Sequence, residues 1–301
     1  MAMDKRCIDC ARRSQVRVME KYGLLAEKQI AFLAFFDEWV QSANGASPLE
    51  AGQHLRAELE RVTGIADPYS EEKRAGNQLA MQLYHEWKPL VYQSDDPFSM
   101  ALRLAVAGNI MDYGASERFD IQQTIRNVLH ADFAIDHSRA LQEKIRQAGS
   151  VLYLGDNAGE IVFDRLLIEV MQHPDVTFAV RGAPVINDVT LEDAAFAGMH
   201  TVANVISNGH NAPSTLPEKS SPEFRSVFEK ADLIISKGQG NLEGLWDRHD
   251  SRIFFLLMAK CPVFAELLRV PEQSFIVYNR AALVTEEMNL QRAWISKAKI
   301  T

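Results

Sequence analysis

The sequence is poor in cysteine, in long apolar runs and in excess positive charge, and each lack excludes a class of protein. It has 3 cysteines in 301 residues, and its first residues lack the apolar segment of a signal peptide. We therefore expect reduced thiols and a cytoplasmic protein. No apolar run approaches the ~20 residues that span a bilayer. The net charge of −8 argues against a general nucleic-acid binder. We expect neither a membrane nor a nucleic acid as partner.

Two hydrophobic patterns divide the chain near residue 150. Before it, apolar residues recur at helical spacing, and after it apolar runs of strand length alternate with helical segments. This alternation is typical of a doubly wound, mostly parallel sheet. We therefore predict an α/β fold, with a helical N-terminal domain over 1–149 packed on a Rossmann-like domain over 150–301. The predicted helices of the first part are 15–42, 47–64, one from 67, 96–114, 121–129 and 138–147.

The second part carries six predicted strands and four predicted helices. The strands are 151–154, 176–180, 201–206, 233–236, 253–258 and 275–277, and the helices are 160–171, 222–230, 242–246 and 262–268. The segment 208–221 is rich in Asn, Pro, Ser and Gly. It is predicted to be a mobile loop over the site.

Asp156 and Asn157 come directly after the first of these strands and before a helix. Ligands of open α/β sheets bind at the carboxyl ends of strands, so this position favours chemistry. The turn lacks the Gly-Lys-Ser/Thr ending of a Walker loop and the glycine spacing of a dinucleotide-binding loop. Adjacent Asp and Asn are hard oxygen ligands that suit Mg²⁺ or Mn²⁺ better than zinc. Alone, the pair is equally explained by an Asx turn in which Asp156 caps the helix.

Two more predicted strands end in polar residues. Arg181 and Asp188 follow the second strand, and Lys237 follows the fourth. If these strands neighbour the first, Asp188 approaches Asp156 and Asn157, and the three side chains form an oxygen-only metal site open to water and phosphate. The plainer alternatives are that Asp188 caps a helix, Arg181 pairs with a surface carboxylate and Lys237 is solvated.

The ordered set of motifs resembles the metal-dependent damage-control phosphatases, long grouped as domain of unknown function eighty-nine. The C-terminal motifs are Gly-Asp-Asn-Ala-Gly-Glu at 155–160, Arg-Gly-x-Pro-x-x-Asn-Asp-x-Thr-x-x-Asp at 181–193 and Lys-Gly-x-x-Asn at 237–241. The N-terminal half resembles the small prokaryotic branch of the family, and the resemblance covers nearly the whole chain. Its motifs there are Cys7-x-x-Cys10, Asp67-Pro68-Tyr69 with Lys73 and Asn77, and Gly-Asn-Ile-Met-Asp at 108–112.

The resemblance implies hydrolysis of phosphomonoesters of small metabolites, such as sugar phosphates, nucleotides or damaged phosphometabolites, with Mn, Co, Ni or Mg as the divalent metal. It implies Asp156, Asn157 and Asp188 as metal ligands and Lys237 as the lysine that contacts phosphate. The attacking group is either metal-activated water or a carboxylate such as Asp188. Glu160 is a further candidate, as an orienting or proton-transfer group. Asp193 is a candidate for the same role or for contact with the substrate. Three more residues are candidates for substrate binding: Arg181, Asn109 and Asp112.

Cys7 and Cys10 have the spacing of half a zinc knuckle, and Cys261 is a candidate third ligand. Zinc at Cys7 and Cys10 is therefore one hypothesis, with ordinary or redox-active thiols as the other. None of the 8 histidines falls in the strand-end motifs, which argues against a zinc hydrolase.

Two other functions fit the same pattern. An S-adenosylmethionine-dependent carboxyl methyltransferase would use the doubly wound half and its glycine-containing first turn. However, the second predicted strand is followed by Arg181-Gly182 and not by the acidic residue that would hold a ribose. The other alternative is a non-catalytic protein that binds a phosphometabolite or a metal.

Overall fold

The fold is built on a seven-stranded sheet with the order β1-β7-β6-β5-β2-β3-β4. The computed structural model describes residues 4–42, 48–108, 128–129 and 131–282. Neighbouring strands run parallel except β6 and β7, which are antiparallel. The strands are β1 (Ile135–Asp136), β2 (Val151–Leu154), β3 (Val176–Val180), β4 (Asn204–Ser207), β5 (Leu233–Lys237), β6 (Ile253–Met258) and β7 (Phe275–Tyr278).

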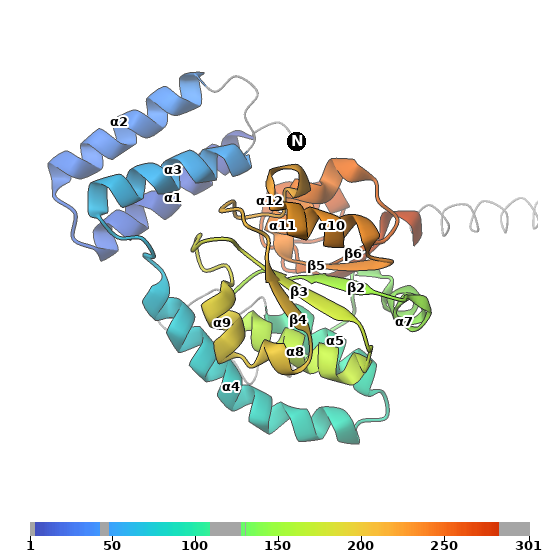
Figure 1. Cartoon of the computed structure of the whole chain (residues 1–301). Helices are drawn as coiled ribbons and strands as arrows, with labels where there is room; N and C mark the ends of the chain where they lie inside the picture. Colours follow the sequence, from blue (N-terminus) through green and yellow to red (C-terminus); the bar gives the residue numbers. More distant parts are fainter. Residues whose placement is uncertain (1–3, 43–47, 109–127, 130, 283–301) are drawn as a thin grey trace, which may run out of the picture.

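Helices cover both faces of the sheet, as Figure 1 shows. Successive strand residues point to opposite faces, so Val151 and Tyr153 of β2 join one buried cluster while Leu152 and Leu154 join the other. Both faces are therefore apolar, which explains the uninterrupted hydrophobic runs of these strands. One face carries α4 (Ser70–Gln93), α5 (Pro97–Ala107), α7 (Ser138–Gln147), α8 (Glu160–Met171) and α9 (Leu191–Phe196), and the other α10 (Pro222–Lys230), α11 (Gly238–Leu245) and α12 (Pro262–Leu268).

The first three helices form a separate small cluster beside the sheet (Figure 1). They are α1 (Lys5–Lys21), α2 (Ala26–Ser42) and α3 (Pro48–Thr63), and their core consists of Val18, Met19, Phe32, Phe36, Leu55 and Leu59. The prediction of one helical run over 15–42 was wrong. The chain turns at Gly23, which has a φ of +59°. Glycine adopts this left-handed conformation at little cost, so two helices form instead of one.

Most predicted elements of the second part are confirmed. The predicted bounds of β2, β3, β6, α8, α10 and α12 coincide with the observed ones. Part of the predicted strand 201–206 is irregular or 3₁₀-helical, and β4 begins only at Asn204. The helix predicted over 242–246 begins four residues earlier, at Gly238. Strand β1 was missed because a strand of two residues carries no detectable hydrophobic pattern. It precedes residue 150 in the chain but belongs to the sheet, where it pairs with β7.

The segment 208–221 is packed into the fold. It buries Asn208, Ala212, Ser214 and Thr215, and the main chain of Ser221 donates to the carbonyl of Asn208 at 2.8 Å. A segment with these buried side chains is part of the framework of the site, whereas the sequence predicted a mobile loop over it.

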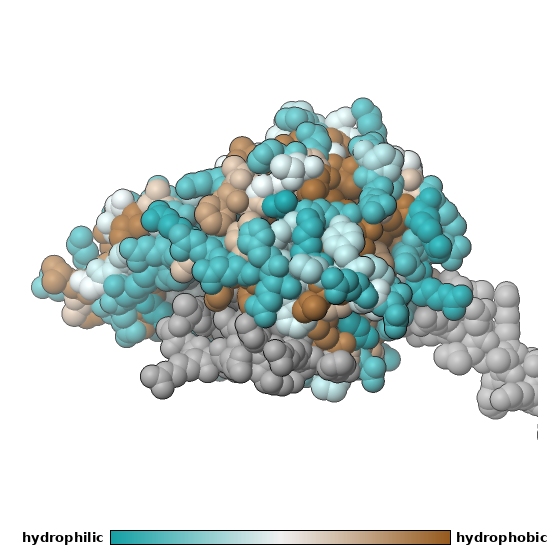
Figure 2. Space-filling model, turned by 90° about the horizontal axis from the view of Figure 1, so that it is seen from below, coloured by the Kyte–Doolittle hydropathy of each residue, from teal (hydrophilic) through white to brown (hydrophobic). Residues whose placement is uncertain are grey.

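Seen from below, the described surface is largely hydrophilic, with separate hydrophobic areas (Figure 2). Among the described helices, none has both the length and the apolar character needed to cross a bilayer.

Candidate active site

The strand order places the three predicted strand ends side by side. Strand β2 lies between β3 and β5, with Leu154 opposite Ala179 on one side and Ser236 on the other. Because all three strands are parallel, their carboxyl ends lie at the same edge of the sheet. The segments that carry Asp156, Asp188 and Lys237 therefore meet there, as the sequence predicted.

The segments of Asp156 and Asp188 are joined by main-chain hydrogen bonds. Asn157 and Asp188 form an isolated antiparallel bridge. The amide of Ala158 donates to the carbonyl of Asn187 at 2.9 Å, and the amide of Val189 donates to the carbonyl of Asp156 at 2.8 Å. These bonds hold the three predicted metal ligands together, and all three side chains are buried.

Neither Asp156 nor Asp188 caps a helix, so the plainer alternative for both is not supported. The residue before α8 is Gly159, with no side-chain capping bond, and the residue before α9 is Thr190. The carboxylate of Asp156 instead packs against Gly238, the first residue of α11. A Cβ atom at position 238 would lie 1.8 Å from Oδ2 of Asp156, so only glycine leaves room for this carboxylate.

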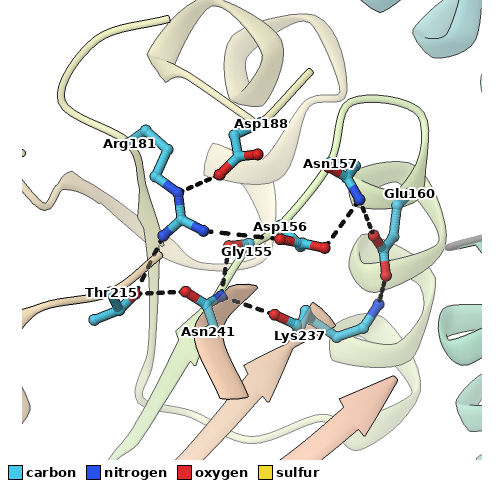
Figure 3. Close-up of polar contacts among 9 residues, drawn as sticks. All are labelled: Gly155, Asp156, Asn157, Glu160, Arg181, Asp188, Thr215, Lys237 and Asn241. Atoms are coloured by element: carbon cyan, nitrogen blue, oxygen red, sulfur yellow. Dashed lines mark hydrogen bonds and ion pairs between the residues drawn. The ribbon is translucent and has the colours of Figure 1, made fainter. Parts of the chain in front are cut away.

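Arg181 links Asp156 and Asp188, the two acidic residues among the predicted metal ligands, as Figure 3 shows. Its Nε donates to Oδ2 of Asp188 at 2.5 Å, and its Nη2 lies 3.8 Å from Oδ1 of Asp156. Its Nη1 donates to Oγ1 of Thr215 at 3.2 Å, and that hydroxyl donates to Oδ1 of Asn241 at 2.8 Å. The partner of Arg181 is thus a buried site carboxylate and not a surface one.

Lys237 is completely buried and points toward α8. Its Nζ donates to the carbonyl of Ala105 at 2.7 Å, to Oδ1 of Asp164 at 2.7 Å and to the carboxylate of Glu160. Burial by itself lowers the pKa of this ammonium, but the two carboxylates raise it above its ordinary value. Lys237 is therefore a cation held by three acceptors, and the solvated alternative is wrong.

Glu160 connects Lys237 to the turn that carries Asp156 and Asn157. Nδ2 of Asn157 lies 3.4 Å from Oε2 of Glu160 and donates to Oδ2 of Asp156 at 2.9 Å. Behind Glu160, the hydroxyl of Tyr153 donates to Oδ1 of Asp164 at 2.7 Å. Burial raises the pKa of Asp164 to about 7, although the neighbouring Lys237 acts in the opposite direction. A buried chain of polar contacts thus runs from Asp156 to Tyr153.

Asp193 is the third residue of α9 and belongs to a capping box with Thr190. Its carboxylate accepts hydrogen bonds from the amide and hydroxyl of Thr190, from Nδ2 of Asn77 and from Nζ of Lys73. These contacts favour an orienting role within the protein over contact with substrate.

The remaining predicted site residues are Asn109, Asp112 and the cysteines. Asn109 and Asp112 lie outside the described residues. Cys7 and Cys10 lie on α1, and burial raises the pKa of the Cys7 thiol, with Glu243 and Cys261 adding to the effect. In the described ranges, no group of three or more His, Cys, Asp or Glu side chains is placed to hold a metal. Zinc at Cys7 and Cys10 stays a prediction.

Charge balance at the site fits a divalent cation. Three buried carboxylates, those of Asp156, Asp188 and Glu160, lie beside two cationic groups, Arg181 and Lys237. Asp164, whose pKa is about 7, adds partial negative charge near neutral pH. An excess of negative charge in a buried cluster is costly unless a cation offsets it. Carboxylate and amide oxygens are ligands that Mg²⁺ and Mn²⁺ accept. Asp156, Asn157 and Asp188 are the residues that would hold such an ion.

Sequence reasoning missed several residues of this cluster, including Asp164, Tyr153 and Thr215. It quoted Asn241 only as part of a motif and gave it no role. Asp164 falls on the fourth position after Glu160 of a predicted helix, so it shares a face with it. That spacing was the available signal. Thr215 lies in the segment predicted to be mobile, and no local pattern marks it.

Comparison with known proteins places the chain in a family. The family described as "Damage-control phosphatase ARMT1-like domain" matches residues 3–276. The damage-control phosphatase PH1575 of Pyrococcus horikoshii is 37% identical over 235 residues, covering 77% of this chain and 81% of that protein. A damage-control phosphatase of Archaeoglobus fulgidus is 36% identical over 217 residues, covering 69% of this chain and 75% of that protein.

The fold agrees with a solved structure. The crystal structure of the DUF89 family protein PH1575 from Pyrococcus horikoshii superposes with a TM-score of 0.85 and 32% identity, covering 93% of this chain and 99% of that one. The predicted α/β architecture and the predicted family are both confirmed, while the assignment to the small prokaryotic branch stays a prediction. The chain belongs to the damage-control phosphatase family.

Proposed function

We propose that this protein is a metal-dependent phosphatase that hydrolyses phosphomonoesters of small metabolites. The observation that carries the proposal is the buried cluster at the ends of β2, β3 and β5, in which carboxylates outnumber cations. Family membership adds to it, because the relatives in Pyrococcus horikoshii and Archaeoglobus fulgidus are named damage-control phosphatases.

Asp156, Asn157 and Asp188 would hold Mn²⁺, Co²⁺, Ni²⁺ or Mg²⁺. When bound there, such an ion would supply a Lewis acid for phosphoryl oxygens and for water. Arg181 orients Asp188 through the 2.5 Å bond and is itself held by Thr215. Its guanidinium also provides positive charge next to the ligands, which favours an anionic substrate.

Glu160 is proposed to orient Asn157 and to accept or release a proton at its carboxylate. Lys237 acts through Glu160, because its ammonium already contacts three protein oxygens. The alternative is direct contact of Lys237 with phosphate. In Lys237→Ala, a fall in kcat at unchanged KM supports the first role, and a rise in KM supports the second.

A metal-by-substrate screen tests the function. The purified protein is stripped with EDTA and assayed for phosphate release from p-nitrophenyl phosphate and a panel of sugar phosphates and nucleotides, with each of the four metals added. We expect turnover that depends on added metal. Absence of turnover with all metals and substrates would contradict the proposal. Metal binding without turnover would favour a non-catalytic binding protein.

Variants of the ligands test the site. Asp156→Ala and Asp188→Ala should each abolish both turnover and bound Mn²⁺ while the circular dichroism spectrum persists, because both carboxylates share one ion. Asn279→Asp serves as the control and should retain Mn²⁺, because Asn279 is buried directly after β7 and bonds to the start of β6. Normal metal stoichiometry in either alanine variant contradicts a shared site. Binding of S-adenosylmethionine in calorimetry would favour the methyltransferase.

A further inference from the structure

We propose that Asn77, on α4, is a positioning residue for the metal site. This role rests on the function proposed above. Asn77 ties the turn that carries Asp156 and Asn157 to the segment that carries Asp188. It acts from behind them, through Gly159 and Asp193.

The first contact holds the ligand turn. Oδ1 of Asn77 accepts a hydrogen bond from the amide of Gly159 at 2.7 Å. Gly159 has a φ of +78° and directly precedes α8, two residues after Asn157. Helix α4 approaches this turn closely, since a Cβ atom at Gly159 would lie 3.2 Å from the carbonyl oxygen of Gly76. The turn is thus hydrogen-bonded to the side chain of Asn77 and packed against the main chain of α4.

The second contact holds the residues that follow Asp188. Nδ2 of Asn77 donates to Oδ1 of Asp193 at 2.9 Å. Oδ2 of Asp193 accepts from the amide and hydroxyl of Thr190, at 2.9 and 2.8 Å. Thr190 follows Asp188 by two residues. Asn77 therefore spans the two ligand segments, with Asp193 as the link to the second.

Lys73 supports the same connection from one helical turn away. Its Nζ lies 3.0 Å from Oδ2 of Asp193 and 3.2 Å from Oδ2 of Asp67. Residues four apart share a helix face, so Lys73 and Asn77 present a cation and an amide to Asp193 together. Lys73, Asn77 and Asp193 are all buried, and water competes little for their hydrogen bonds.

An amide at position 77 matches the polarity of both partners. Gly159 offers a donor and Asp193 offers an acceptor, so the side chain between them must accept on one side and donate on the other. A carboxylate at 77 would face the carboxylate of Asp193. An apolar side chain would leave a buried amide and a buried carboxylate without this partner, which is costly.

A reciprocal exchange of the two side chains tests the proposal. Asn77→Asp and Asp193→Asn are made singly and together, and the affinity for Mn²⁺ is measured by titration calorimetry. Each single variant mismatches the pair, with two carboxylates in one case and two amides in the other. We expect each to weaken Mn²⁺ binding by about 10–100-fold, the usual effect of losing a partner behind a ligand. The double variant reverses donor and acceptor and should restore the affinity to within about threefold.

Asn279→Asp is the matched control. Asn279 is also buried and bonded to main-chain atoms, but its partners are Ser251, Ile253 and Ala282. It should lower thermal stability without changing Mn²⁺ affinity. In activity assays, the single variants at 77 and 193 should need more Mn²⁺ for half-maximal rate, with KM for p-nitrophenyl phosphate unchanged.

Different outcomes separate this inference from the proposed function. Wild-type protein that binds no metal would overturn the metal site and the inference together. Wild-type binding with unchanged affinity in folded single variants would overturn only the role of Asn77, as would a folded double variant that stays weak. If the single variants do not fold, Asn77→Ser is measured instead, and wild-type Mn²⁺ affinity in that variant overturns the proposal.

Discussion

Glu243 on α11 shows how a single residue makes stability depend on pH. Burial raises the pKa of its carboxyl to about 7, against 4.5 ordinarily. Its Oε1 has no hydrogen-bond partner within the described part of the chain. The folded state therefore keeps a proton that the unfolded state releases between these two pH values. The contribution of Glu243 to stability is present below about pH 4.5 and is lost as the pH rises through 7.

Glu243→Gln should remove this pH dependence. We expect the free energy of unfolding to rise by about 1–3 kcal/mol at pH 8 and to stay nearly unchanged at pH 4.5, because glutamine cannot ionise. Urea denaturation of both proteins at a series of pH values measures the difference. Glu223→Gln, an exposed position on α10, is the control and should show no such trend. Parallel stability curves for wild type and Glu243→Gln would contradict the argument.

At the scale of elements, the close approach of α11 to the ligand turn depends on Gly238. Its φ is +78°, and a Cβ atom there would lie 1.8 Å from Oδ2 of Asp156. Gly238→Ala should therefore displace the Asp156 carboxylate and weaken Mn²⁺ binding by at least about tenfold. Calorimetric titration with Mn²⁺ measures this.

Gly64→Ala separates steric displacement from backbone strain. Gly64, which follows α3, has a similar φ of +73°, but nothing lies within 4 Å of an added Cβ atom. The substitution Gly64→Ala should therefore lower the free energy of unfolding by about 1 kcal/mol and leave the affinity for Mn²⁺ unchanged. Equal effects of the two substitutions on Mn²⁺ binding would show that the contact with Asp156 is unimportant.

At the scale of the whole molecule, α1–α3 should open independently of the sheet. Their core of six buried side chains is separate from the two clusters of the sheet. Ion pairs between partly exposed groups, such as Arg6 with Glu266 and Lys21 with Glu72, join these helices to the rest, and such pairs contribute little. We therefore expect lower protection against hydrogen exchange in α1–α3 than in β2 and β5.

Phe32→Ala tests this independence. Phe32 is fully buried in the small cluster, and its truncation should cost about 3–5 kcal/mol there. Hydrogen exchange followed by mass spectrometry should show faster exchange in α1–α3 and unchanged exchange in β2 and β5. Leu152→Ala, at a buried position of the sheet, should accelerate exchange in β2 and β5 but not in α1–α3, because α1–α3 already exchange through their own opening. If each substitution accelerated exchange in α1–α3, β2 and β5 alike, the small cluster and the sheet would form one cooperative unit.

The sequence by itself determined the elements and the ligand candidates. The bounds of β2, β3 and α8 follow from hydrophobic periodicity, which depends only on residues a few positions apart. Asp156 and Asp188 could be singled out because each follows a strand, where ligands of such sheets bind. Family membership followed from the same motifs.

Only the tertiary structure decided how these parts meet. Strand order sets β3 and β5 on either side of β2, and packing of α4 brings Asn77 to Gly159, 82 positions away in the chain. The direction of Lys237, toward Glu160 and Asp164, was equally hidden. Local pattern could not show these contacts, because partners far apart in the chain are selected by the burial and hydrogen bonding of the completed fold.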